Sequence, residues 1–228
     1  MNKKTVEIIA QSFDDAINAQ KGGAARVELV SALSEGGLTP SFAMIEQIIK
    51  NIDIEVAVML RPMSRSFCYE KHYLDVMKRD AEVFQDMGVK RLVLGILDKE
   101  GNVDLGALNY VLENINIDVT FHRAIDESRN ILESVRTLNK CKKVTHILTS
   151  GGAGKAVDHL DIIRDMIKIS DKRIMIGSGL NFDVLDKIKK EIDYNIREYD
   201  VHFGTFAQDS NGIVDEKKVR EIVERFNS

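Results

Sequence analysis

The stretch T-V-E-I-I-A-Q-S-F-D-D, residues 5–15, joins a short run of β-branched and apolar residues to a helix start. Ser12 and Asp15 have the spacing of a capping box, which predicts that the helix begins there. An open, doubly wound sheet typically carries a Gly-rich turn directly after its first strand. Because this junction contains no glycine, it favours a closed parallel barrel over the open sheet.

The same strand-then-helix pattern continues along the chain. A helical pattern lies between consecutive strands and after the last one, and Asp126 and Asp215 are placed to cap two of these helices. Strands that alternate with helices pair in parallel. The sequence therefore predicts an α/β protein, a (β/α)8 TIM barrel in a single domain over residues 1–228. The predicted strands are 5–10, 26–30, 54–60, 91–96, 118–122, 145–149, 173–177 and 198–203.

The composition excludes several classes of function. The net charge is −4, with acidic and basic residues interleaved and no basic block, which argues against nucleic-acid binding. No apolar stretch approaches the roughly 18 residues of a membrane span, and the first residues do not resemble a signal peptide. Two cysteines do not suggest a disulfide framework. We therefore expect a cytoplasmic protein without membrane or nucleic-acid partners.

Strand periodicity predicts which polar side chains point into the barrel. In the fifth strand, Val119 and Phe121 belong to the helix-facing set, so His122 faces inward. Most of the inward polar residues lie near the C-terminal strand ends, where barrel enzymes place their chemistry. An interior polar network without chemistry is the alternative, above all for Glu7, the deepest of them. The predicted inward set is Glu7, Glu28, Arg61, His122, Thr149 and His202.

These residues suggest a site for a small anionic ligand. Glu28 or His122 would serve as general acid or base, with Glu7 beside them, and Arg61 would anchor the anion. Thr149 and His202 are expected among the anion-binding residues. Two glycine-rich turns follow strands six and seven, where barrels commonly bind phosphate through backbone N–H groups, although glycine also serves ordinary turns. The turns are Ser150-Gly151-Gly152 and Gly177-Ser178-Gly179.

Several motifs together closely resemble the CutC family of copper homeostasis proteins. They are R-V-E-L-V-S-A-L-S-E-G-G-L-T-P-S at 26–41, M-L-R-P at 59–62, F-H-R-A-I-D at 121–126, I-L-T-S-G-G at 147–152 and G-S-G at 177–179. The resemblance covers essentially the whole chain. It implies a (β/α)8 barrel, a cytoplasmic location, and a role in copper tolerance or copper binding, with Cu(I) as the metal.

The sequence departs from that family at its sulfur ligands. Many members carry cysteine where Val30 stands here, and often another where Ile9 and Ala10 stand. Thiolates select Cu(I), so the obvious copper ligands are missing. Met63 and Cys68, in the loop after the third strand, are the remaining soft candidates for Cu(I), and an unremarkable loop thiol is the alternative.

Three functions stay open at this point. The first is a copper-handling protein, as the resemblance implies. The second is an enzyme that uses acid–base chemistry on a small anionic or phosphorylated metabolite. The third is a binding or scaffold role. We expect the ligand to be a small anion or copper. We also expect a homodimer or higher homo-oligomer, with 34–38 as a candidate contact loop.

Overall fold

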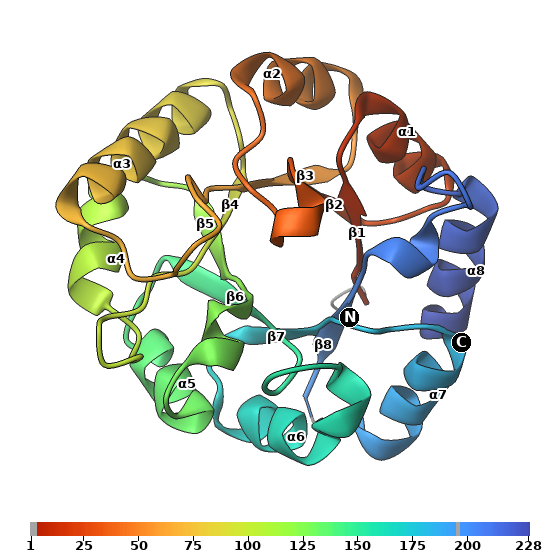
Figure 1. Ribbon diagram of the computed structural model, residues 1–228. Helices are drawn as coiled ribbons and strands as arrows, with labels where there is room; N and C mark the ends of the chain where they lie inside the picture. Colours follow the sequence, from red (N-terminus) through yellow and green to blue (C-terminus); the bar gives the residue numbers. More distant parts are fainter. Residues whose placement is uncertain (1–3, 195–196) are drawn as a thin grey trace.

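The eight predicted strands close into one parallel barrel, in the order β1 to β8, with the helices outside it (Figure 1). This computed structural model describes residues 4–194 and 197–228. The strands are β1 (Val6–Ala10), β2 (Arg26–Leu29), β3 (Glu55–Met59), β4 (Arg91–Leu94), β5 (Asp118–Phe121), β6 (Val144–Thr149), β7 (Arg173–Ile176) and β8 (Tyr199–Phe203). The predicted (β/α)8 fold is confirmed.

The outer layer consists of amphipathic helices that bury one stripe against the strands. In the last helix, α8, Val219, Ile222 and Phe226 are fully buried, and Asp215 caps the first turn as predicted. None of the described helices is long and apolar enough to cross a membrane. The helices are α1 (Phe13–Lys21), α2 (Phe42–Asn51), α3 (Lys71–Asp86), α4 (Leu105–Val111), α5 (Ile131–Asn139), α6 (Leu160–Ile169), α7 (Phe182–Glu191) and α8 (Glu216–Asn227).

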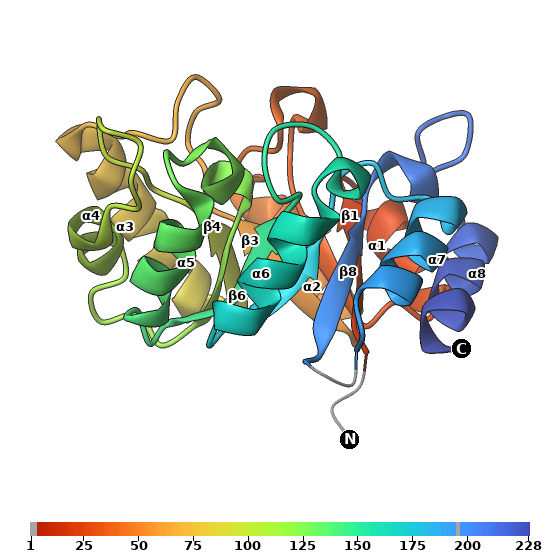
Figure 2. The ribbon, with the colours of Figure 1, turned by 90° about the horizontal axis from the view of Figure 1, so that it is seen from below.

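The two ends of the barrel differ in how the chain covers them. The connections that follow the strands rise above the upper rim in Figure 2, and four of them contain a short 3₁₀ helix. The connections that lead from helices back into strands are short, as in α5 to β6. The upper rim, at the C-terminal strand ends, is therefore the end at which the chain can build a site.

A ring of charged side chains fills the opposite, N-terminal end of the barrel. Glu55 accepts hydrogen bonds from Arg26 at 3.5 Å and from Arg91 at 2.7 Å. Arg91 donates to Nδ1 of His146 at 2.9 Å. Nε2 of His146 lies 3.4 Å from Asp200, which in turn lies 3.7 Å from Arg26. Every charge in this ring faces an opposite charge, as a buried ionic group requires.

We expect Arg26 to be essential for stability, because it is bonded to Glu7 in the barrel interior as well as to the ring. Arg26→Met leaves the buried carboxylates of Glu7 and Asp200 short of positive charge. It should lower the free energy of unfolding by about 3–5 kcal/mol in urea titrations at pH 7.5. The double variant Arg26→Met/Glu7→Gln should recover part of that loss. Arg79→Met, which breaks the exposed pair with Glu82, should cost about 1 kcal/mol or less. Equal losses in the two single variants would contradict this role.

Candidate functional site

A cavity of about 680 Å³ opens at the C-terminal ends of the strands. Its floor is formed by inward-facing strand side chains and its rim by the loops that follow the strands. The apolar part of the wall includes Ile9, Val30, Met59 and Leu148. The polar part includes side chains or backbone groups of Glu28, Arg61, His122, Arg123, Ser178 and His202, together with the acidic residues Glu35, Asp126 and Glu127. The cavity thus combines an apolar body with a few convergent polar groups, as ligand sites usually do.

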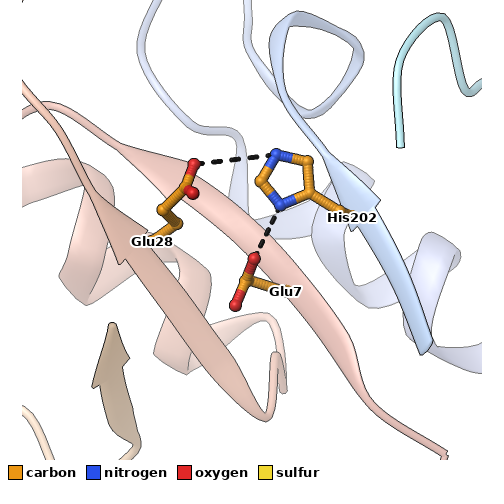
Figure 3. A group of neighbouring side chains, drawn as sticks. All are labelled: Glu7, Glu28 and His202. Carbon is orange, nitrogen blue, oxygen red and sulfur yellow. Dashed lines mark hydrogen bonds and ion pairs between the residues drawn. The ribbon is translucent and has the colours of Figure 1, made fainter. Parts of the chain in front are cut away.

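Glu7, Glu28 and His202 form one connected group at the floor (Figure 3). Nδ1 of His202 lies 2.7 Å from Oε1 of Glu7, and its Nε2 lies 3.8 Å from Oε2 of Glu28. Glu7 also accepts a hydrogen bond from Arg26. Glu7 is fully buried and lies beneath the cavity, whereas Glu28 and His202 are part of its wall. Glu7 therefore positions His202, and Glu28 and His202 are the groups that a ligand can touch.

Burial and neighbouring charges separate the protonation states of these three groups. Burial opposes ionisation of Glu7, but Arg26 and His202 outweigh it and hold the Glu7 pKa far below its usual range. Burial also opposes the imidazolium form of His202, but the carboxylates of Glu28 and Glu7 raise its pKa. For Glu28, burial dominates and raises the pKa to about 7. Glu28 can therefore gain or lose a proton near neutral pH, while Glu7 stays ionised.

His122 is held at the end of β5 with one ring nitrogen engaged and the other free. Its Nδ1 accepts a hydrogen bond from the Ala124 backbone N–H at 3.1 Å, which caps the 3₁₀ helix Arg123–Glu127. Nε2 is buried and has no partner among the described residues. The ring fits only because residue 95 is glycine, since a Cβ there would lie 2.5 Å from Nδ1. Burial, followed by Arg61, lowers the His122 pKa to about 3, so the ring is neutral.

Arg61 is a buried cation that carries no carboxylate partner among residues 4–194 and 197–228. Its terminal nitrogens donate to backbone carbonyl groups of Glu35, Gly37 and Ser64 at 3.0–3.1 Å. Its Nε is buried without a partner. The guanidinium also stacks on Phe67, with its carbon 4.6 Å from the ring centre. The carbonyl groups orient Arg61 but leave its positive charge uncompensated beside the cavity.

The first glycine-rich turn is already occupied by a carboxylate of the protein itself. The Ser150 N–H donates to Asp126 at 3.0 Å, and the Ser150 hydroxyl donates to it at 2.7 Å. Thr149 also donates to Asp126 and lies 3.8 Å from the Met166 sulfur on α6, so it faces the helices. The prediction that Thr149 points inward was wrong. Thr149, Ser150, Gly151 and Gly152 all lie outside the cavity wall.

Asp126 was expected to cap the following helix, and that expectation was wrong. Asn130 caps α5 instead, accepting from the Glu133 N–H at 3.1 Å. Asp126 turns back to the β6 end and also pairs with Arg123 at 2.9 Å. Sequence reasoning missed Arg123 as a cavity residue, although it directly follows His122 in the F-H-R-A-I-D motif.

The second glycine-rich turn does reach the cavity. Ser178 and Gly179 line it, and Ser178 has a left-handed backbone with φ +79° while its hydroxyl donates to Gly154 at 2.8 Å. Gly177 lies outside the wall, but it makes room for His202, because a Cβ there would lie 3.2 Å from the imidazole ring. Of the predicted anion-binding residues, the structure therefore brings Arg61, Ser178, Gly179 and His202 to the cavity.

The soft ligands proposed for copper lie outside the cavity wall as well. Cys68 is partly exposed in the loop after β3, and Met63 in the same loop packs against the hydrophobic core. Cys141 is buried after α5, on the way into β6 at the other end of the barrel. The two thiols therefore do not meet in one metal site.

The raised pKa of Glu28 predicts a specific dependence of stability on pH. Between about pH 4.5 and 7 the folded protein holds a proton on Glu28 that the unfolded chain has lost. The free energy of unfolding therefore falls as the pH rises through this range. The glutamine side chain in Glu28→Gln is neutral at every pH, so this variant does not show that fall in the free energy of unfolding. Its free energy of unfolding relative to wild type should rise by about 2–3 kcal/mol from pH 5 to pH 8, at about 1.4 kcal/mol per pKa unit. Glu221→Gln, on an exposed face of α8, should run parallel to wild type. A parallel profile for Glu28→Gln would contradict the assignment.

Solved barrels resemble this chain in fold. A CutC protein from Streptococcus agalactiae superposes with a TM-score of 0.80 at 27% identity, over 89% of this chain and 99% of that one. Phosphoribosyl anthranilate isomerase from Thermus thermophilus superposes with a TM-score of 0.61 over 98% of each chain, but at 13% identity it shares the fold alone.

Sequence comparison is more specific. A family protein CutC of Serratia proteamaculans is 36% identical over 195 residues, which cover 85% of this chain and 76% of that protein. The copper homeostasis protein cutC homolog of Dictyostelium discoideum is 30% identical, and the match covers 97% of each chain. The profile of the CutC family matches residues 4–224. The chain belongs to the CutC family.

Proposed function

We propose that this protein takes part in copper homeostasis. The family match over nearly the whole chain supports this role, together with the Dictyostelium relative named as a copper homeostasis protein homolog, which matches from end to end. Two cysteines that form no disulfide agree with a reducing, cytoplasmic location. Self-association into a homodimer or higher oligomer stays a prediction, which light scattering on the purified protein checks.

The donor groups around the cavity fit Cu(I) poorly as a bound cargo, because Met59 is the one sulfur-bearing side chain among the described residues of its wall. Cu(I) selects thiolate and thioether sulfur. Glu7, Glu28 and His202 do offer three donor atoms within 4.8 Å of one another, but these are oxygen and nitrogen, and Arg26 already neutralises Glu7. The thiols of Cys68 and Cys141 are separated by the length of the barrel. We infer that the copper role does not depend on a thiolate site in this chain.

The copper role predicts a growth phenotype. Deletion of the gene should lower copper tolerance, and the wild-type chain should restore it. Cys68→Ser should restore it equally, because Cys68 lies outside the cavity, whereas Glu28→Gln should not. Growth across a copper series measures this. Unchanged tolerance in the deletion strain would contradict the role. Stoichiometric Cu(I) binding under reducing conditions that both Cys68→Ser and Met63→Leu abolish would place copper in the loop after β3 instead.

A second function is favoured by one observation, the uncompensated charge of Arg61. We propose that the cavity binds a small anionic ligand and exchanges a proton with it. A buried guanidinium without a carboxylate partner is costly, and an anion in the cavity would offset that cost. His202 adds positive charge to the same wall, whereas Arg123, which also lines it, is paired with Asp126. Tyr69, which also lies close to Arg61, stays neutral because burial raises its pKa to about 12.

Anion binding can be tested with inorganic phosphate and sulfate. Isothermal titration or ³¹P NMR should detect binding to wild type, and Arg61→Met should weaken it about tenfold or more, since a charge-assisted contact is lost. Arg65→Met is the matched control, because Arg65 is an exposed arginine of the same loop. Equal binding by both variants would exclude Arg61 as the anion ligand.

A further inference from the structure

The hydrogen bond between Ala124 and His122 fixes which ring nitrogen of His122 carries the proton. Nδ1 accepts the Ala124 N–H, so it has no proton of its own, and in the neutral ring the proton sits on Nε2. Nε2 is buried and has no hydrogen-bond partner within 4–194 and 197–228, and His122 lines the cavity. The side chain therefore presents an N–H donor to whatever the cavity binds.

A neutral imidazole in this tautomer acts as a hydrogen-bond donor and not as a base. To accept a proton, Nε2 would first have to lose its own, and protonation of Nδ1 would break the cap at Ala124. Arg61 and Arg123 also line the cavity, and their positive charges disfavour a positive charge on the ring. The acceptor that suits such a donor is a carbonyl oxygen on which negative charge develops, a pattern known from barrel isomerases.

Glu28 is the group in the same cavity that can carry a proton. Its Oε1 is buried and has no hydrogen-bond partner among the residues that the structure describes. Glu28 lines the cavity from β2, three strands away from β5 in the ring of eight. His202 faces Oε2, which leaves Oε1 for a ligand. The cavity thus offers a proton acceptor and a separate neutral donor on different sides of a bound molecule.

We propose that the cavity enolises a small carbonyl compound that carries an anionic group, an inference that rests on the proposed anion-binding function. Glu28 takes the proton from the carbon next to the carbonyl group. That C–H bond breaks, and its electron pair forms the enolate, whose oxygen accepts a hydrogen bond from Nε2 of His122. Glu28 then returns the proton to the same or the neighbouring carbon. The step needs no oxidant or reductant, and Arg61 faces the anionic group.

Solvent deuterium exchange tests the step directly. Dihydroxyacetone phosphate and glycolaldehyde phosphate, with phosphate-free dihydroxyacetone for comparison, are incubated with the full chain in D₂O and followed by ¹H NMR. Wild type should exchange the α-proton of the phosphorylated probes faster than buffer does. Glu28→Gln should lower the rate about 100-fold or more. Glu221→Gln should match wild type, and Glu28→Gln purified in the same way controls for contaminating isomerases, whose exchange it would retain. The wild-type rate should rise with pH through about 7 and then level off, because Glu28 must be ionised.

The role of His122 has its own readout. ¹⁵N NMR should find His122 neutral, with the proton on Nε2, from pH 5 to 9. His122→Gln keeps a neutral N–H donor and should retain more exchange than His122→Ala. Thermal unfolding of both variants shows that each is folded. A His122 that titrates within this range, or that carries its proton on Nδ1, would overturn the assignment even if a variant fails to fold.

The two proposals fail in different ways. If phosphate binds and depends on Arg61, but none of the three probes exchanges above the buffer rate, enolisation is overturned and anion binding stands. If phosphate does not bind, the proposed anion site is overturned. Exchange that survives Glu28→Gln unchanged would overturn Glu28 as the proton carrier.

Discussion

The ion pair between Arg26 and Glu7 at the centre of the barrel is the interaction on which the rest of the site depends. Arg26 belongs to the charged ring at the N-terminal end, and Glu7 bonds His202 at the floor of the cavity. A continuous series of opposite charges therefore runs from Asp200 through Arg26, Glu7 and His202 to Glu28. Each buried charge is balanced by the next. Glu28 ends the series, 3.8 Å from His202. It is the carboxylate of the series whose pKa is raised, because burial outweighs the nearby positive charge.

The two ends of the barrel differ in how their polar atoms are partnered, although Oδ2 of Asp200 in the charged ring also lacks a hydrogen bond among the described residues and has only ion pairs. At the N-terminal end, side chains such as Arg91 and Glu55 find partners within the ring. At the C-terminal end, Nε2 of His122, Oε1 of Glu28 and Nε of Arg61 are buried without hydrogen-bond partners in the part of the chain that the structure describes. Unpaired buried polar atoms cost stability, so the three that lie beside this cavity support a role for it in binding a ligand. The charged ring and the packed helices stabilise the fold and so offset the cost of these unpaired atoms.

Strand alternation predicted the floor of the site well and its rim poorly. Glu28 and His202 face inward because their neighbours along each strand form the apolar, helix-facing set. In β6 the same reasoning was off by one residue: Leu148 faces the cavity, and Thr149 faces α6. A threonine can face either the helices or the barrel interior. The Thr149 hydroxyl faces the helices and donates a hydrogen bond to Asp126. The alternation of inward and outward residues along β6 was predicted correctly, but the pattern did not determine which of the two sets faces inward.

The sequence by itself determined the barrel, its eight strands and the inward direction of Glu28, His122 and His202, because these follow from local periodicity and chain order. Only the tertiary structure decided which polar groups are bonded within the protein and which remain available to a ligand. It filled the first glycine-rich turn with Asp126, tied Glu7 to Arg26, and fixed the His122 tautomer through Ala124 and Gly95. The contacts of Asp126 with Ser150 and of Glu7 with Arg26 join segments far apart in the chain, and the local cap from Ala124 to His122 forms only once β5 and Gly95 hold the ring in place. Periodicity along one strand does not encode these contacts or the loss of solvent around them.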